Sequence, residues 1–156
     1  MTTVTTVLVA RNGAKHLPAT LDALAQQTRR PDRILAIDSA SSDASITVLQ
    51  ERLPGVTVAS ARRGSLAQVV QSVLGRVPTS DESEWYWFLG HDNAPHPRAL
   101  EALLAAVEVS PSVLVAGPKL MRWDDKSIIQ SYGEALGASG ESLQLVVDEL
   151  DQSQHD

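Results

Sequence analysis

Short runs of apolar and β-branched residues alternate along the chain with longer stretches whose apolar residues recur at helical spacing. The run Val4–Ala10 is typical of a buried strand, and Leu17, Leu21 and Leu24 mark one face of a following helix. Further predicted strands are Arg33–Asp38, Val56–Ser60, Trp85–Leu89 and Val113–Ala116. Further predicted helices cover the segment after the capping residues Ser41, Ser42 and Asp43, then Ser65–Arg76 and Pro97–Val109.

This order of elements predicts an α/β fold with a mostly parallel sheet and helices on both faces. The pattern changes after Gly117, where Ser127–Tyr132 and Glu141–Val147 flank a glycine-containing segment and predict a C-terminal β-hairpin. The aromatic run Trp85–Phe88 is expected in the core. Three histidines without a partner readable from spacing are expected at the surface: His16, His96 and His155.

Composition narrows the possible functions. The 156 residues include no cysteine, which excludes thiolate zinc sites, iron–sulfur clusters and cysteine nucleophiles. The chain has 13 Lys+Arg and 19 Asp+Glu, and no basic residue follows Lys126. Six of the acids lie after Lys126, so residues 1–126 are balanced and the net charge of −6 belongs to the C-terminal segment. This distribution argues against a nucleic-acid partner. No run approaches the ~20 apolar residues of a membrane-spanning helix.

Parallel sheets of this kind bind ligands at the carboxyl ends of their strands, so the residues after each strand are the candidates for function. Arg11-Asn12-Gly13 follows the first strand, and its lone glycine excludes both the dinucleotide-binding and the P-loop fingerprints. An ordinary turn is the alternative interpretation there. Asp38 ends the second strand, where it can accept hydrogen bonds from a base or ribose, or instead form an Asx turn.

The third and fourth strand ends carry charged candidates. Arg62 and Arg63 precede Gly64 and a helix, an arrangement that can bind a diphosphate or simply form a solvated surface turn. Gly90-His91-Asp92 follows the aromatic strand and offers imidazole and carboxylate ligands suited to Mn²⁺ or Mg²⁺, with a plain turn as the alternative. No serine-protease-like triad spacing, nucleophile elbow or His-Glu-x-x-His motif is present.

Four pieces of the chain, in this order, carry a resemblance to a known family. The first piece is the opening strand and its loop, Thr6–Gly13, and the second is the first helix, Leu17–Leu24, with the segment that leaves it, Gln27-Thr28 and Pro31–Ile34. The third piece is a D-x-x-S-x-D segment, Asp38–Asp43. The fourth is the strand with the D-x-D motif, Trp87–Leu100. Together they make the sequence similar to family 2 glycosyltransferases of the Rossmann-like GT-A fold over about residues 4–120. These enzymes transfer a sugar from a nucleotide-diphosphate donor.

The resemblance implies a set of site residues. Nucleotide contacts are expected from Ala10, Arg11, Asn12, Asp38, Arg62, Arg63 and His91. A divalent metal, Mn²⁺ or Mg²⁺, is expected on Asp92 and His91. The D-x-D motif departs from the family pattern, because Gly90 removes one carboxylate and His91 stands where an aspartate is common. Arg62-Arg63-Gly64 stands where members often have Asn-x-Gly.

The resemblance also implies that different parts of the protein bind the donor and the acceptor. Residues 1–126 are expected to form the nucleotide-sugar-binding domain, and residues 127–156 a hairpin and acidic connector towards an acceptor-binding half. The catalytic base is expected in that other half, together with the site for a glycan or lipid-linked acceptor. Transfer with inversion, a role in cell-envelope polysaccharide synthesis and a cytoplasmic location, at the inner face of the membrane in the full-length protein, follow from the family alone.

Two other interpretations compete with an enzyme that binds a nucleotide sugar. A non-catalytic binding module of the same fold accounts for the altered metal motif. A sugar nucleotidyltransferase shares the strand order but needs a glycine-rich N-terminal loop with Arg and Lys, which Ala10–Lys15 does not supply.

Overall fold

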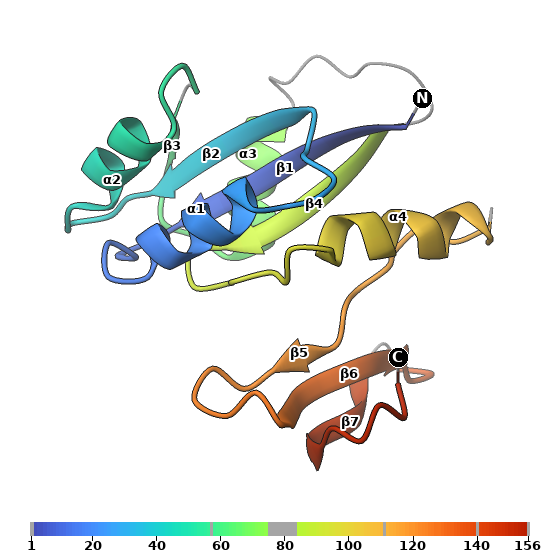
Figure 1. The fold of residues 1–156 in the computed structure, drawn as a ribbon. Coiled ribbons are helices and arrows are strands. Elements are labelled where there is room, and N and C mark those ends of the chain that lie inside the picture. The colour runs from blue at the N-terminus through green and yellow to red at the C-terminus, as the bar shows by residue number, and fades with distance from the viewer. Residues whose placement is uncertain (1, 57, 75–83, 111, 140, 156) are drawn as a thin grey trace. The chain divides into compact units, whose positions relative to one another are not determined.

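The computed structural model describes residues 2–56, 58–74, 84–110, 112–139 and 141–155. The chain divides into two compact units, Met1–Glu101 and Ala102–Asp156. Each unit contains its own β-sheet, of four strands in the first and three in the second (Figure 1).

The first unit is built on a parallel sheet with the strand order β3-β2-β1-β4. β1 is central, and Val4, Val7 and Leu8 on it are fully buried because strands flank it on both sides and helices cover both faces. This sheet confirms the predicted α/β class. The strands are β1 (Thr3–Ala10), β2 (Arg33–Ser39), β3 (Val58–Ala61) and β4 (Glu84–Gly90).

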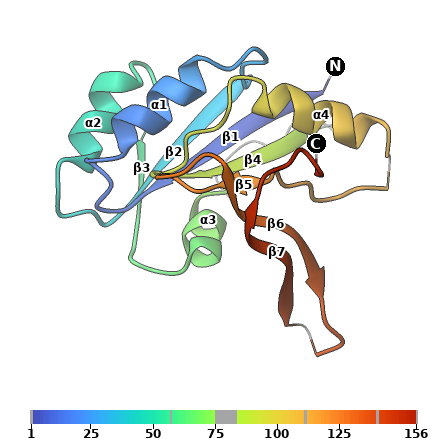
Figure 2. The same cartoon turned by 60° about the horizontal axis from the view of Figure 1, so that its bottom comes forward.

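Helices cover both faces of this sheet, as the sequence predicts (Figure 2). α1 (Leu17–Ala25) and α2 (Ser45–Arg52) pack on one face, and α3 (Leu66–Leu74) packs on the other. α4 (Ala99–Glu108) begins in the first unit and continues into the second. None of the described helices is long and apolar enough to cross a membrane.

Each face has its own apolar core. On the α1 and α2 side, Leu8, Ala36 and Leu89 of the sheet contact helix residues Leu21 and Leu49. On the α3 side, sheet residues such as Val7 and Ile37 contact the three helix valines, Val69, Val70 and Val73. The alternation of side chains along each strand therefore assigns neighbouring residues to opposite cores.

Several element boundaries differ from the predicted ones. β3 begins at Val58 rather than Val56, and α2 begins at Ser45 without a side-chain cap on its N-terminus. The last two residues of the predicted helix Ser65–Arg76, at positions 75 and 76, lie outside the described residues.

The predicted fifth strand, Val113–Ala116, is wrong. Leu114 and Val115 are 86% and 87% exposed and belong to no strand. A strand is stable only when its backbone groups pair with a neighbour, and within the described residues this segment has no such partner. The composition of a four-residue apolar run does not show whether a neighbouring strand will pair with it.

The aromatic strand β4 is only partly core. Tyr86 and Trp87 pack against the two apolar clusters, as expected. Phe88, also expected in the core, is 47% exposed. Phe88 lies on the α3 side of the sheet, where Leu66 at the start of α3 is exposed as well, so the helix leaves this part of the sheet uncovered.

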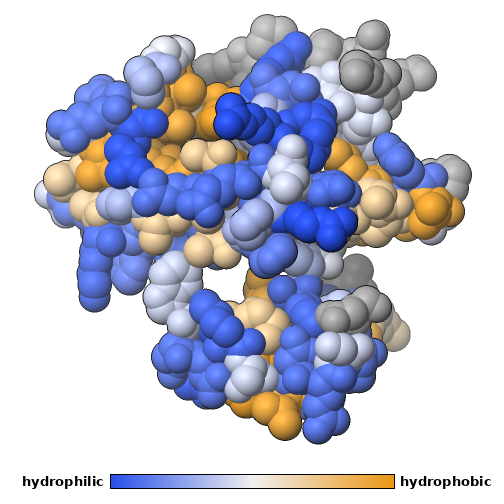
Figure 3. All heavy atoms as spheres, in the orientation of Figure 1, coloured by the Kyte–Doolittle hydropathy of each residue, from blue (hydrophilic) through white to orange (hydrophobic). Residues whose placement is uncertain are grey.

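The second unit contains an antiparallel sheet with the order β5-β6-β7, and β6 and β7 form the predicted hairpin. Lys119 Nζ lies 2.9 Å from Asp151 Oδ2. His155, expected as a surface residue without a partner, instead stacks on Tyr132 with ring centroids 4.7 Å apart. Figure 3 shows hydrophobic side chains among hydrophilic ones on the surface of this unit. The strands are β5 (Leu120–Met121), β6 (Ile128–Leu136) and β7 (Ser142–Leu150).

Acid is expected to destabilise the first unit partly through Asp32. Its Oδ2 accepts hydrogen bonds from Arg29 Nη2 at 2.6 Å and from the Val4 backbone N–H at 2.8 Å, and these bonds lower the pKa of Asp32 below 3.8. A lowered folded-state pKa contributes stability above the unfolded-state value and loses it as the pH falls through the folded-state value. Urea unfolding at about pH 6 and about pH 3 should therefore show a smaller acid-induced loss for Asp32→Asn than for the parent chain. Equal losses would contradict this assignment.

Candidate functional site

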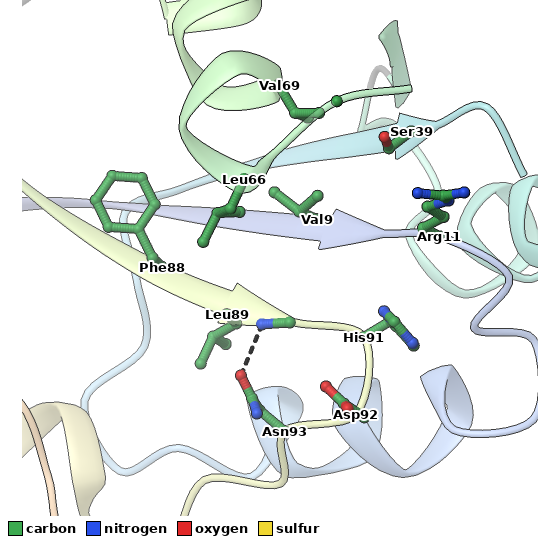
Figure 4. A pocket seen from close by; sticks show the side chains of 12 residues that line it. Val9, Arg11, Ser39, Leu66, Val69, Phe88, Leu89, His91, Asp92 and Asn93 are labelled. Carbon is green, nitrogen blue, oxygen red and sulfur yellow. Dashed lines mark hydrogen bonds between the residues drawn. The ribbon is translucent and has the colours of Figure 1, made fainter. Parts of the chain in front are cut away.

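A cleft of about 330 Å³ lies in the first unit where β1, β2 and β4 end and α3 begins (Figure 4). The parallel register brings these strand ends together, since Ala10 pairs with Asp38 and Val9 with Gly90. Polar groups gather near the strand ends, and apolar side chains lie further back along the sheet. The lining consists of Val9, Arg11, Ser39, Gly64, Leu66, Val69, Phe88, Leu89, Gly90, His91, Asp92 and Asn93.

The loop after β1 is joined to the loop after β2 through Asn12. The Asn12 backbone N–H donates to Ser41 Oγ at 3.0 Å, and Asn12 Oδ1 accepts from the Ser42 backbone N–H at 2.8 Å. Asn12 and Ala40 both have left-handed backbone conformations, with φ of 47° and 51°. Asn12, a predicted nucleotide contact, thus uses its side-chain carbonyl to hold the two loops together.

Asp43 and Ser45 join the same two loops at a second point. Ser45 Oγ accepts from the Gly13 N–H at 2.8 Å, and Asp43 Oδ2 accepts from the Ala14 N–H at 3.0 Å. Asp43 Oδ1 also accepts from the hydroxyl and the backbone N–H of Ser45. The hydrogen bond from the Ser45 hydroxyl is the main reason that the pKa of Asp43 is lowered. The predicted capping residues of α2 therefore position the β1 loop.

The carboxyl end of β2 carries polar atoms without partners. Asp38 and Ser39 are each 2% exposed. Asp38 Oδ2 accepts from the Ser41 N–H at 3.1 Å, whereas Asp38 Oδ1 and Ser39 Oγ have no hydrogen-bond partner in the described part of the chain. Ser39 lines the cleft and Asp38 does not. A buried polar atom without a partner is costly, so a ligand that bonds to it gains affinity.

Gly90 lies in the hydrogen-bonded turn that follows β4. The Gly90 N–H donates to Asn93 Oδ1 at 2.7 Å, and the Asn93 N–H donates back to the Gly90 carbonyl at 3.3 Å. A Cβ at position 90 would lie 2.9 Å from Asp92 Oδ1. A side chain at position 90, where family members carry the first D-x-D aspartate, would therefore require the exposed Asp92 carboxylate to shift.

His91 packs onto the loop after β1. A Cβ at Gly13 would lie 2.4 Å from His91 Cδ2, so the imidazole occupies the space above the Gly13 backbone. The His91 carbonyl accepts a hydrogen bond from Thr20 Oγ1 of α1 at 2.7 Å. His91 therefore connects the β4 turn to both α1 and the β1 loop.

The residues present do not form a ready-made metal site. Among the residues that the structure describes, no three His, Asp or Glu side chains form a group that could hold a metal ion. Asp92 is the one carboxylate in the cleft lining, and the His91 ring already lies against Gly13. Mg²⁺ at a nucleotide site takes one or two protein carboxylates and completes its shell with phosphate oxygens and water, so this cleft would contribute Asp92 as its single carboxylate. The expected metal site on Asp92 and His91 remains a prediction.

The predicted arginines occupy different places. Arg11 is half-buried and lines the cleft. Arg62 and Arg63 are exposed and lie outside the lining, although the neighbouring Gly64 belongs to it. Ala10, another predicted contact, is fully buried beneath the site.

The sequence matches the family described as Glycosyl transferase family 2 over residues 5–132. The chain belongs to this family. None of the curated proteins matches it. The match covers β1 from Thr5 onward, the other strands of the parallel sheet and the loops at their carboxyl ends, and it extends into β6.

Solved structures with a similar fold agree with the family match. S. aureus TarS has 18% sequence identity and a TM-score of 0.55, with 76% of this chain and 24% of that chain covered. A crystal structure of TarS residues 1–349 in complex with UDP has 16% identity and a TM-score of 0.55, with 79% and 40% covered. Glucosyl-3-phosphoglycerate synthase from Mycobacterium tuberculosis, in complex with Mn²⁺, UDP and glucosyl-3-phosphoglycerate, has 20% identity and a TM-score of 0.53, with 70% and 40% covered. The chain therefore spans less than half the length of these structures.

Of the lining residues, only Arg11, His91 and Asp92 were among the predicted site residues, and those that were not predicted include Ser39, Leu66 and Phe88. Ser39 follows Asp38 directly, and its place at a strand end was a usable signal. Phe88 lies two residues before Gly90, so strand alternation puts it on the same face as the cleft. Leu66 gives no such signal, because its exposure depends on where α3 sits on the sheet.

Replacing Gly13 by alanine is expected to destabilise the first unit by roughly 1–3 kcal/mol, because the new methyl group overlaps the His91 ring. Truncating the ring as well, in a Gly13→Ala/His91→Ala double variant, should recover part of that loss. Urea unfolding measures both effects. Gly117→Ala is the matched control, since a Cβ there meets nothing within 4 Å. A Gly13→Ala variant as stable as this control would rule out the described packing.

Proposed function

We propose that the cleft binds the nucleotide-diphosphate sugar that a family 2 glycosyltransferase uses as donor. The observation that carries the proposal is the convergence of Arg11, Ser39 and Asp92 in one cleft at the carboxyl ends of three parallel strands. Ligands of open α/β sheets bind at this edge. The apolar wall behind these polar groups is typical of small-molecule sites, in which a few polar groups fix the orientation of the ligand.

The nucleoside and the phosphates would use different parts of the site. Asp38 with Ala10 and Asn12 of the β1 loop would hold the nucleoside, and Asp38 Oδ1 is an acceptor without a partner among the described residues. Arg62 or Arg63, next to the lining residue Gly64, would assist the phosphates by charge-assisted hydrogen bonds. Both roles rest on the family likeness and on the position of each loop.

The reaction we propose is transfer of the sugar to an acceptor hydroxyl with inversion. The bond between the anomeric carbon and the nucleotide diphosphate breaks, and the acceptor oxygen forms the new bond while its proton passes to a base. We propose that residues 1–156 form the donor-binding part and that the base and the acceptor site belong to a further part of the protein. The partial coverage of the solved structures, 24% to 40% of their lengths, is consistent with this division.

A second candidate is a non-catalytic module that keeps the fold. The packing of His91 on Gly13 and the tight turn at Gly90 favour it, since both residues stand where the family's metal motif carries aspartates. This candidate predicts no affinity for nucleotide sugars.

Calorimetry with UDP-, GDP- and dTDP-sugars separates the two candidates, and a charge placed in the cleft tests the location. Leu66 lines the cleft and is 57% exposed, so Leu66→Glu should fold normally and weaken donor binding roughly tenfold or more through repulsion of the diphosphate. Leu145→Glu, at a 66% exposed leucine of β7, is the matched control and should leave the affinity unchanged. Absence of binding to all three sugars would defeat the proposed function, and equal affinity of both variants would place the site elsewhere.

A further inference from the structure

We propose that Arg11 binds the diphosphate of the donor and supplies the positive charge there, so that the chain binds nucleoside diphosphates without a divalent cation. This inference rests on the proposed function and concerns the same cleft. It follows from two independent features: no carboxylate pairs with Arg11 among the described residues, and the turn after β4 contributes a single carboxylate to the cleft lining.

Arg11 differs from most arginines in the described part of the chain. Five of them form ion pairs: Arg29 with Asp32, Arg33 with Glu84, Arg52 with Asp22, Arg98 with Glu101 and Arg122 with Asp124. Within the described ranges, no carboxylate pairs with Arg11, although it is half-buried and lines a cleft. A partly desolvated guanidinium without a counter-ion is unfavourable, and an anionic ligand removes that cost.

The surroundings of Arg11 suit a phosphate group. Figure 4 shows Arg11 at the end of the cleft where Ser39 also lies. The planar guanidinium can donate two parallel hydrogen bonds to one phosphate. Ser39 Oγ is buried beside this end of the cleft and has no hydrogen-bond partner among the described residues, so it must become exposed before it can donate to a ligand.

The turn after β4 offers a cation much less. Gly90 has no side chain and so supplies no ligand. The His91 imidazole is packed on Gly13. Only the exposed Asp92 remains available as a ligand in the lining, and solvent screens its repulsion of the diphosphate. Among the residues that line the cleft, Arg11 is the only Lys or Arg and so provides the permanent positive charge.

Binding of UDP, GDP and dTDP, measured by calorimetry in EDTA and again in Mn²⁺, tests the inference. At least one of them should bind in EDTA, with an affinity that Mn²⁺ changes less than about threefold. Arg11→Gln should weaken that binding roughly tenfold or more, as expected for loss of a charge-assisted hydrogen bond. Arg11→Lys should lose less, because it retains a point charge. Arg30→Gln is the control, since Arg30 is exposed and precedes β2 at the opposite end of the strands.

The matching nucleoside without phosphates provides the second readout, because it should bind Arg11→Gln and the parent chain equally. Equal weakening of nucleoside and nucleotide would overturn the inference, since Arg11 would then contact the base. Binding that requires Mn²⁺, disappears in Asp92→Asn and persists in Arg11→Gln would also overturn it while leaving the proposed function intact. Failure of every nucleotide to bind in either condition would instead reject the proposed function. Urea unfolding of Arg11→Gln establishes that the variant is folded.

Discussion

The arrangement of the site depends on the backbone of Gly13, which is buried between three loops. Its N–H donates to Ser45 Oγ at the start of α2, and the His91 ring of the β4 turn covers the position where a side chain would begin. The loops after β1, β2 and β4 therefore meet at one residue. Any group on these loops that contacts a ligand is positioned relative to the others through this contact.

The alternation of side chains along the strands explains why a core and a cleft share one face of the sheet. Val7 and Ile37 contact the valines of α3, and Val9, Ser39 and Phe88, on the same face, line the cleft. Arg11 continues β1 on this side. The cleft begins where α3 no longer covers the sheet, and the architecture of the sheet itself does not change there.

Much of the fold could be predicted from the sequence, because β1, β2 and β4 are long apolar runs separated by amphipathic helices. Val113–Ala116 could not be judged in this way, since an apolar run becomes a strand only if a neighbour pairs with it. The sequence also indicated the strand-end segments that surround the cleft, because parallel topology brings strand ends together. It could not indicate that Asn12 bonds to the β2 loop or that His91 lies on Gly13. Those orientations depend on contacts between segments far apart in the chain.

The exposed Phe88 and Leu66 also affect how the cleft interacts with water. Their apolar surfaces cannot hydrogen-bond to the water that fills the back of the cleft, so a ligand that displaces this water releases it to the bulk. Burial of apolar surface lowers the heat capacity of the system. The enthalpy of binding at this site will therefore become more favourable as the temperature rises, even where the contacts that orient the ligand are polar.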